Sequence, residues 1–478
     1  MDSRTLFRSL PIAFVAATAA ALLIAGCAGV SPSDLSGSTA ASETGPAFVV
    51  GTDAPLASVV SFSVQVQSVN AITSTGTSVP LLSGMPTVDF ARFNGLQTLL
   101  DMNDVPVGAY TQIQITLGSA TLGYLNVPAS GAPTIVTEAA TYPSSAATYT
   151  YTQPLATPLV VTHAGTPVGL RVDYDLRKSV AVDGSGNFTG QVTPTFNVST
   201  VGPGDTGGYI DTIDAAVVSV NTTAQSFVVQ GPHGRQFTIS VSGQTDWENN
   251  ESLSALTTSS IVQVSGELDK ADATLDADDV AILSQDGFYA GGQVTYVLPA
   301  TVQVSPAPAP GFDLYVRGLL PTTTGISLGQ IAQVDLNGNE KFFIYRMHSP
   351  LTQFLFNSST LLPGQHVSIG GLATGATNPQ AVAVKRVVLR HWGFNGVVVP
   401  GSMSSANGTF QMQITGFAGL LVAQTVTVYT ATPTVFRGGL TGLSAVPASV
   451  NVRVVGLLLK DPTSGKTILL AHYVDALP

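Results

Sequence analysis

The second half of the chain repeats one pattern three times, and this repeat restricts the possible folds more than any other feature. The clearest copies are the segments VQVSGEL, VSIGGLA and VRVVGLL, which carry Gly266, Gly371 and Gly456 after their apolar residues. An aromatic residue lies 19, 17 and 20 residues before these glycines, and a threonine lies two residues before each aromatic. The pairs are Thr245 and Trp247, Thr352 and Phe354, and Thr434 and Phe436. Such regularity predicts tandem copies of one small unit.

Each copy predicts five short strands and one loop or helical turn. A leucine-bearing link separates the aromatic residue from the glycine, and another strand-like run follows the glycine. Glycine lets a strand bend at the corner of a small barrel without a clashing side chain. We therefore expect five-stranded barrels at residues 208–286, 287–392 and 393–478. The copies resemble an uncharacterised family, similar to the oligonucleotide/oligosaccharide-binding barrel in strand count, that occurs in tandem in bacterial lipoproteins.

Residues 47–200 show strict alternation of apolar and polar residues instead. The segments VVSFSVQVQSV and GAYTQIQITLGSATL are typical of half-buried strands. Their apolar positions are Val60, Phe62, Val64, Val66, Ile113, Ile115 and Leu117. Only LQTLLDMNDV, near residue 100, favours a short helix, and VGPGDTGG at 201–208 is expected to be a linker. The predicted fold is all-β, with an antiparallel β-sandwich followed by the three small barrels.

Three short motifs carry a family resemblance over about 150 residues of this first domain. They are TDAP at 52–55, VPVGAY at 105–110, and VDYDL at 172–176 before a GNF turn. In combination they resemble an uncharacterised domain family of bacterial lipoproteins, whose sandwich is related to transthyretin-like and carboxypeptidase-regulatory-like folds. The resemblance implies a fold and a compartment, and it implies no activity.

The only cysteine of the chain lies near the amino terminus, in the segment LLIAGCAGV. Arg4 and Arg8 precede an apolar run from Leu10 to Ile24, as in a signal peptide. The order Ile24, Ala25, Gly26, Cys27 resembles the bacterial lipobox, in which the cysteine thiol receives a lipid. We expect a signal peptide at 1–26, lipidation at Cys27 and a flexible tether at 27–46. The alternative is an ordinary secretory signal with a chance cysteine.

Lipidation at Cys27 would make the membrane the first partner of the protein. Several acyl chains, at about 0.8 kcal/mol per buried methylene, give permanent attachment. Residue 28 is alanine rather than the aspartate that retains Gram-negative lipoproteins in the inner membrane, so by resemblance the outer membrane is favoured. Whether the protein faces the periplasm or the cell surface is left open. The net charge of −11 argues against nucleic acid as a partner, because phosphate binding needs positive charge.

Few residues are candidates for catalysis. GISLG at 325–329 has the form of a serine-hydrolase elbow with Ser327 as nucleophile, but a strand-like run follows it where that elbow needs a helix. The histidines show no zinc-binding spacing; they are His163, His233, His348, His366, His391 and His472. We expect no catalytic residue, no metal and no cofactor.

An acidic cluster is the one candidate for weak cation binding. It comprises Asp269, Asp272, Asp276, Asp278 and Asp279. Calcium prefers several carboxylate oxygens, but no EF-hand spacing is present. A solvated loop between two strands is therefore the favoured interpretation.

Four further residues are candidates for a site. Asp173 and Asp175 lie two apart on a predicted strand and would share a face, and a surface position is favoured over a carboxylate pair. Trp247 and Trp392 are able to stack on sugar rings. For Trp247 a core position is favoured, and for Trp392 packing at a domain junction.

Three functions remain open at this point. The favoured hypothesis is a lipid-anchored binding or adhesion module with recognition in its loops, for a glycan or a protein outside the cell or in the periplasm. The second is a structural spacer or assembly part of the envelope, which predicts no concave ligand site. The third is a carbohydrate-active or metal-dependent enzyme, which is disfavoured because no catalytic constellation is present.

Overall fold

The computed structural model describes residues 43–54, 59–93, 96–128, 130–162, 167–183, 188–202, 209–230, 236–268, 274–298, 311–321, 326–336, 338–345, 354–373, 381–416 and 424–476. The expected signal peptide and the lipobox residues Ile24, Ala25, Gly26 and Cys27 lie outside this part of the chain. The expected tether lies outside it up to residue 42, and its last three residues already belong to the first strand. Among the described residues, no helix is long and apolar enough to cross a membrane.

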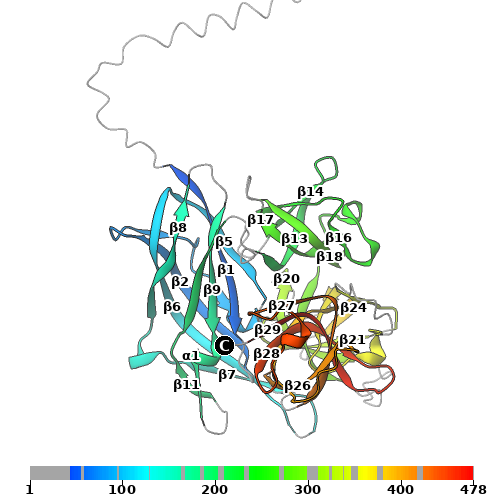
Figure 1. Ribbon diagram of the computed structural model, residues 1–478. Coiled ribbons are helices and arrows are strands. Elements are labelled where there is room, and N and C mark those ends of the chain that lie inside the picture. The colour runs from blue at the N-terminus through cyan, green and yellow to red at the C-terminus, as the bar shows by residue number, and fades with distance from the viewer. Residues whose placement is uncertain are drawn as a thin grey trace, which may run out of the picture. The chain divides into compact units, whose positions relative to one another are not determined.

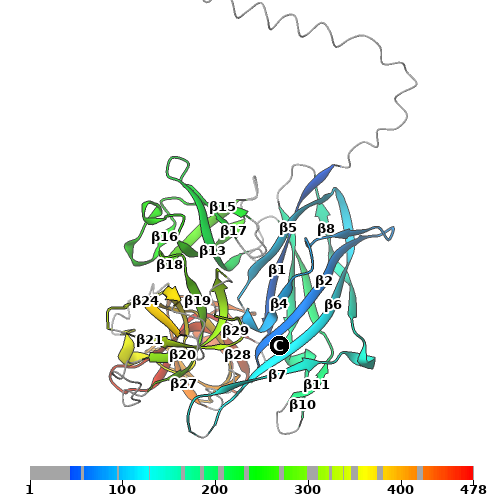
Figure 2. The same ribbon diagram turned by 180° about the vertical axis from the view of Figure 1, so that it is seen from behind.

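The first domain is a sandwich of two sheets (Figure 1). One sheet has the order β12-β9-β1-β5, with β1 (Thr44–Ala54), β5 (Thr98–Pro106), β9 (Val168–Asp175) and β12 (Phe196–Val201). The other, seen in Figure 2, is built on the long pair β2 (Val59–Thr73) and β6 (Gly108–Asn126), with β3 (Ser78–Pro80), β4 (Thr87–Asp89), β7 (Thr134–Ala140) and β8 (Tyr149–Val161). Smaller elements are η1 (Phe90–Arg92), η2 (Pro143–Ser145), α1 (Leu176–Ser179), β10 (Val180–Val182) and β11 (Phe188–Val192).

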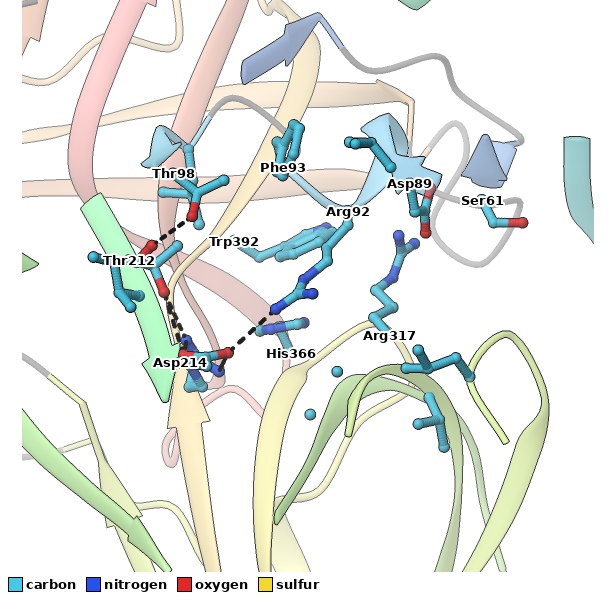
Figure 3. Close-up of a pocket in the computed structure, with 18 of the residues that line it drawn as sticks. Ser61, Asp89, Arg92, Phe93, Thr98, Thr212, Asp214, Arg317, His366 and Trp392 are labelled. Atoms are coloured by element: carbon cyan, nitrogen blue, oxygen red, sulfur yellow. Dashed lines mark hydrogen bonds and ion pairs between the residues drawn. The ribbon is translucent and has the colours of Figure 1, made fainter. Parts of the chain in front are cut away.

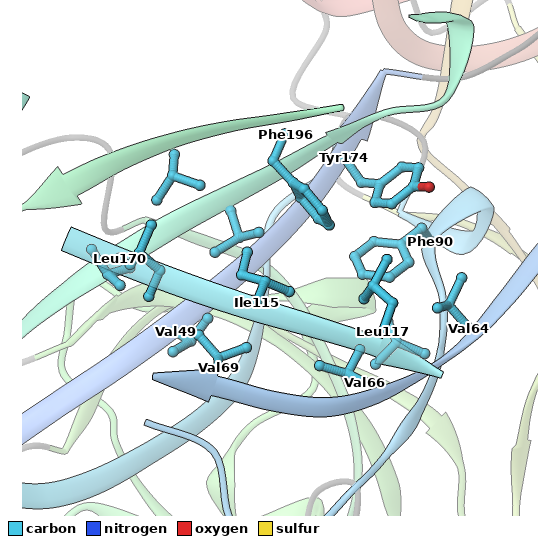
Figure 4. Packing of buried hydrophobic residues seen from close by; sticks show 14 of the residues in the cluster. Val49, Val64, Val66, Val69, Phe90, Ile115, Leu117, Leu170, Tyr174 and Phe196 are labelled. Carbon is cyan, nitrogen blue, oxygen red and sulfur yellow. The ribbon is translucent and has the colours of Figure 1, made fainter. Parts of the chain in front are cut away.

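The apolar residues of the alternating segments form the core between these sheets. The inward residues of β2 and β6 are buried as expected, and Figure 4 shows Val64, Val66, Ile115 and Leu117 packed together. The aromatic ring of Tyr174 completes the core, because its centroid lies 4.8 Å from the ring centroids of both Phe90 and Phe196. Val60 differs from the prediction. It lies next to a register shift in β2 and packs outside this core, against Leu125 and Tyr315.

Two predictions for the sandwich were wrong. The first sheet is not purely antiparallel, because β1 pairs with β9 in parallel. The segment LQTLLDMNDV is not a helix but contains strand β5, which pairs with β1 over its whole length. Its adjacent leucines explain the error. Leu100 packs on the sandwich core and Leu99 packs in the core of the next domain, so both faces of β5 are covered and the sequence lacks the alternation of a half-buried strand.

The remaining described chain forms three small barrels with one topology. The third is a closed barrel, and the sheets of the first and second are each closed by one additional strand pairing. In each, the first strand pairs with the second and the fourth, and the third pairs in parallel with the fifth to close the ring. The first barrel has β13 (Ile210–Asn221), β14 (Ser226–Gln230), β15 (Gln236–Ser240), β17 (Ile261–Leu268) and β18 (Leu275–Ser284), with β16 (Asp246–Trp247) beside β18. The second has β19 (Tyr289–Val297), β20 (Gly311–Leu320), β21 (Ile331–Asp335), β23 (His366–Ala373) and β24 (Ala381–Arg390), with β22 (Lys341–Ile344) beside β24. The third has β25 (Trp392–Val398), β26 (Thr409–Gly416), β27 (Thr425–Arg437), β28 (Asn451–Lys460) and β29 (Thr467–Ala476).

Short 3-10 turns account for the leucine-bearing links. They are η6 (Leu253–Ala255), η7 (Ser358–Thr360) and η8 (Leu443–Ala445), and each lies before the fourth ring strand of its barrel. A further turn, η5 (Glu248–Asn250), follows β16. The expected helical turn in each copy is therefore present.

The repeated glycines mark the same place in each barrel. Register shifts lie at Gly266, Gly371 and Gly456, in the pairing of the fourth ring strand with the fifth. A Cβ at Gly266 would collide with the carbonyl oxygen of Asp276, and a Cβ at Gly456 with that of Leu470. Gly266 and Gly456 are therefore required for the close approach of two backbones, in agreement with the predicted bend of the strand at a barrel corner.

In the first and third barrels, the repeated threonine forms a hydrogen bond to the fifth strand of the barrel. Thr245 Oγ1 donates to the carbonyl oxygen of Ala277 over 2.7 Å, and Thr434 Oγ1 donates to that of Ala471 over 2.9 Å. The aromatic residues two positions later pack on the barrel cores: Trp247 is half-buried beside Phe227, and Phe354 is buried. The core position expected for Trp247 is confirmed. Thr352, the threonine of the second copy, lies outside the described residues.

We predict that Gly456→Ala lowers the stability of the protein by about 1–3 kcal/mol, because the new Cβ forces β28 away from β29. Differential scanning calorimetry would show the loss as a lower melting temperature. Gly243→Ala is the matched control, since a Cβ there meets no atom within 4 Å, and a shift of under about 0.5 kcal/mol is expected. Equal melting temperatures for both variants would contradict the role given to the glycine.

Candidate functional site

Ser327 does not lie on a nucleophile elbow. It is exposed in a loop four residues before β21 begins, so a strand and not a helix follows it, as predicted. A strand-to-helix turn is what the hydrolase motif requires. The motif therefore has the geometry of a loop.

The acidic cluster is divided by the fold. Asp269 and Asp272 lie outside the described residues, whereas Asp276, Asp278 and Asp279 belong to strand β18. The expected solvated loop is thus wrong for these three residues. Asp276 and Asp278 are exposed, but Asp279 is buried and accepts a hydrogen bond from Ser265 Oγ over 3.1 Å. In the described ranges, no group of three or more His, Cys, Asp or Glu side chains is placed to hold a metal ion.

Asp173 and Asp175 lie in a charged cavity of about 520 Å³ and not on an open surface. Asp175 is buried and caps α1 by accepting from the backbone N–H of Lys178 over 3.1 Å, so the expected surface position is wrong for this residue. Burial raises the pKa of Asp173, against the opposing effect of Arg171 and Arg453. Asp175 forms an ion pair with Lys178 at 3.1 Å, and the arginine and lysine side chains that line this cavity outnumber its aspartates.

Trp392 packs at a junction, as predicted. It is 3% exposed, its ring is stacked on His366 with centroids 4.2 Å apart, and the guanidinium of Arg317 lies 4.9 Å from its centroid. The faces of a ring packed in this way leave no room for a sugar. His163, His233 and His348 lie outside the described residues. His391 and His472 are stacked on each other with centroids 4.7 Å apart.

A second cavity, the junction pocket, has a volume of about 420 Å³ and lies where the sandwich meets the barrels. Its wall combines residues of β2, β4, η1 and β5 with residues of the first and second barrels and with Trp392 of the third. Figure 3 shows the charged and polar groups that face one another here. They include Asp89, Arg92, Asp214, Arg317 and His366.

Local structure at η1 directs Arg92 into this pocket. Phe90 and Phe93 are buried and meet edge to face with ring centroids 5.9 Å apart. These two anchors hold the turn against the sandwich. Arg92 lies between them and remains 40% exposed at its side chain, with Nη2 3.7 Å from Asp214 Oδ2.

A buried ion pair between two barrels forms the floor of the junction pocket. Arg390, at the end of β24, donates from Nη2 to Asp214 Oδ1 over 2.9 Å and from Nη1 to Asp214 Oδ2 over 3.1 Å. Tyr289 donates its hydroxyl to Asp214 Oδ2 over 2.6 Å. Burial acts to raise the pKa of Asp214, but Arg390, Arg92 and the Tyr289 hydroxyl outweigh it and hold that pKa below the usual 3.8. Asp214 is therefore ionised at neutral pH.

Arg317 occupies the opposite wall. Its Nη1 donates to the carbonyl oxygen of Ala91 over 3.2 Å and its Nη2 to Gln293 Oε1 over 3.0 Å. Close by, Asp89 accepts from the backbone N–H of Phe62 over 2.8 Å. Burial raises the pKa of Asp89, and the charge of Arg317 opposes this effect. This wall ties η1 of the sandwich to the second barrel.

Two lining residues retain unused hydrogen-bonding capacity. Within the described chain, no hydrogen bond is formed by the guanidinium of Arg92. His366 is 8% exposed, and its Nδ1 is buried with no hydrogen-bond partner among the described residues. Burial lowers the pKa of His366 well below the usual 6.5, and Arg390, Arg317 and Arg92 lower it further, so the ring is neutral at pH 7.

The sequence matches one known family over part of its length. Residues 47–189 match a domain of unknown function, DUF4382. The DUF4382 domain spans the sandwich from β1 into β11, and it contributes η1 with Arg92 to the junction pocket. The description of this family assigns no activity. No curated protein matches the chain.

The arginines and aspartates of the junction pocket were not identified in the sequence analysis. Their signal was present, because Arg317 in LYVRGLL and Arg390 in VVLRHWG interrupt apolar strand segments in a chain of which only 10% of residues are charged. Charges in such segments are buried and therefore need partners. The partners lie far away in sequence: Asp214 is 176 positions from Arg390.

We predict that Asp214→Asn destabilises the protein by about 3–5 kcal/mol, because it leaves the buried charge of Arg390 without its counterion. Denaturant unfolding would measure the loss, and adding Arg390→Gln to the same chain is expected to recover part of it. The control is Asp286→Asn at the exposed ion pair with Lys385, where about 1 kcal/mol or less is expected. A small effect at Asp214 would contradict its structural role.

Proposed function

We propose that this chain is an exported, lipid-anchored protein of the bacterial cell envelope that binds a small ligand in the junction pocket. The junction pocket itself is the observation that supports binding over a purely structural role, which predicts no concave ligand site. Its volume of about 420 Å³ falls in the range of pockets that hold small molecules, which commonly lie between domains. The proposed ligand site therefore lies at the junction of the domains, whereas the sequence analysis favoured recognition in the loops.

The compartment is proposed from the sequence. Cys27 after Ile24, Ala25 and Gly26 resembles a lipobox, and the motifs of the domain after it resemble an uncharacterised domain family of bacterial lipoproteins. We further propose that the repeats are tandem barrels of the oligonucleotide/oligosaccharide-binding kind. Five strands and a parallel closure of the third on the fifth, found in all three copies, support this proposal.

A structural role in the envelope is the second candidate, and the bonds between domains favour it. Arg386 of the second barrel pairs with Glu251 of the first at 2.7 Å, and Gln365 Nε2 donates to the carbonyl oxygen of Leu458 in the third over 3.0 Å. Such contacts between domains are expected in a rigid spacer. They equally hold the walls of a pocket in place, so the two candidates differ in whether the pocket is occupied.

The anchor is tested by Cys27→Ala in the full-length protein. We expect the wild-type chain in the membrane fraction, labelled by a radioactive fatty acid, and the variant unlabelled. Membrane fractionation, with protease treatment of intact and permeabilised cells, would also locate the protein on one side of the outer membrane. Membrane attachment and labelling that persist in the variant would contradict lipidation at Cys27.

The pocket is tested with a neutral fluorescent probe, N-phenyl-1-naphthylamine, on soluble chain from residue 28 onward, which contains the whole compact unit from Thr44. We expect saturable binding, and at least tenfold weaker binding for Ser63→Trp, because an indole at this half-buried lining position fills the pocket. Ser68→Trp, on the same strand but outside the pocket, is the control. No saturable binding, or equal loss in both variants, would favour the structural candidate.

A further inference from the structure

The arginines that line the junction pocket outnumber its aspartates by one. Three arginines and two aspartates line it: Arg92, Arg317, Arg390, Asp89 and Asp214. His366 adds none, because its lowered pKa keeps it neutral at pH 7. This surplus occurs in a chain with a net charge of −11, and it lies in a partly enclosed site where charge is screened less than at an open surface.

The surplus charge can be assigned to Arg92. Arg390 is engaged twice by Asp214 and also donates to Ser368 Oγ over 2.9 Å. Arg317 donates to the carbonyl oxygen of Ala91 and to Gln293, and lies over the rings of Tyr315 and Trp392. Among the described residues, Arg92 has only a long ion pair to an aspartate that Arg390 already satisfies. Its five N–H donors therefore remain available to a ligand.

His366 supplies an independent sign of a ligand. Buried polar atoms almost always have a hydrogen-bond partner, and a histidine ring that is 8% exposed with an unpartnered Nδ1 is an exception that needs a reason. Stacking on Trp392 fixes the plane of the ring. A neutral imidazole presents one N–H donor, and Figure 3 shows His366 facing the same space as Arg92.

The remainder of the wall is largely apolar. Nine aliphatic or phenyl side chains line the pocket: Val88, Phe93, Leu96, Leu99, Leu100, Ile213, Phe237, Val316 and Leu328. Leu328 is 51% exposed. A purely polar anion such as phosphate would leave this apolar surface uncovered, whereas an apolar body would cover it.

Resting on the proposed function, we infer that the junction pocket binds an organic monoanion. Its single oxyanion, such as a carboxylate, accepts hydrogen bonds from the Arg92 guanidinium and the His366 ring. Its apolar body lies against Phe93, Leu99 and Ile213. The binding is selective for charge, because a neutral molecule of the same shape leaves Arg92 without an anion.

Two probes that share one skeleton test the inference on the soluble chain. They are N-phenyl-1-naphthylamine, which is neutral, and 8-anilino-1-naphthalenesulfonate, which adds one sulfonate. We expect the sulfonate probe to bind about tenfold more tightly than the neutral one. Arg92→Gln should bring the ratio of the two affinities close to one, and His366→Phe, which retains the stack on Trp392, should lower it severalfold. Lys385→Gln, at an exposed position outside the pocket, should leave the ratio unchanged.

The outcomes separate this inference from the proposed function. Equal affinity of the two probes, or an affinity ratio that Arg92→Gln does not change, overturns the anion inference while the pocket remains a ligand site. Absence of binding by either probe overturns both. In competition, decanoate should displace the sulfonate probe at concentrations at which decanol and inorganic phosphate do not. Displacement by phosphate alone would contradict the requirement for an apolar body.

Discussion

The ion pair of Asp214 with Arg390 is the contact on which the arrangement of the domains depends. Both side chains are almost fully buried, and separating them would leave a charge in a site with little water. The pair links β13 of the first barrel to the end of β24 in the second, and Tyr289 at the start of β19 completes it. Because Arg390 donates to both carboxylate oxygens and Tyr289 donates to one of them, small shifts of either barrel would weaken several bonds at once.

Apolar packing also connects the sandwich to the first barrel and the third barrel to the second. The core of the first barrel includes Phe48, Val50 and Leu99 from the sandwich, and the core of the second includes Leu457 and Leu470 from the third. The described sandwich and barrels accordingly form one compact unit from Thr44 onward. A pocket between them keeps a defined shape because its walls belong to shared cores rather than to separate bodies.

The sequence predicted the parts of this fold that depend on local pattern. Alternation predicted β2 and β6, and the repeated glycines predicted the position in each barrel at which the register of the last two strands shifts. Prediction from the sequence failed where tertiary contacts override the local pattern. Examples are β5, which is covered on both faces, and Asp175, which caps a helix of four residues. The junction pocket as a whole could not be predicted for the same reason: Arg92 and His366 line one pocket only because domains far apart in the sequence fold against each other.

The boundary between the second and third barrels consists of a single residue. β24 ends at Arg390, β25 begins at Trp392, and both of these residues belong to the junction pocket. The barrels therefore share a topology without being interchangeable modules. Duplication or loss of a barrel at this boundary would alter the counterion of Asp214 or the stacking partner of His366, so the number of repeats in this protein is coupled to the integrity of its binding site.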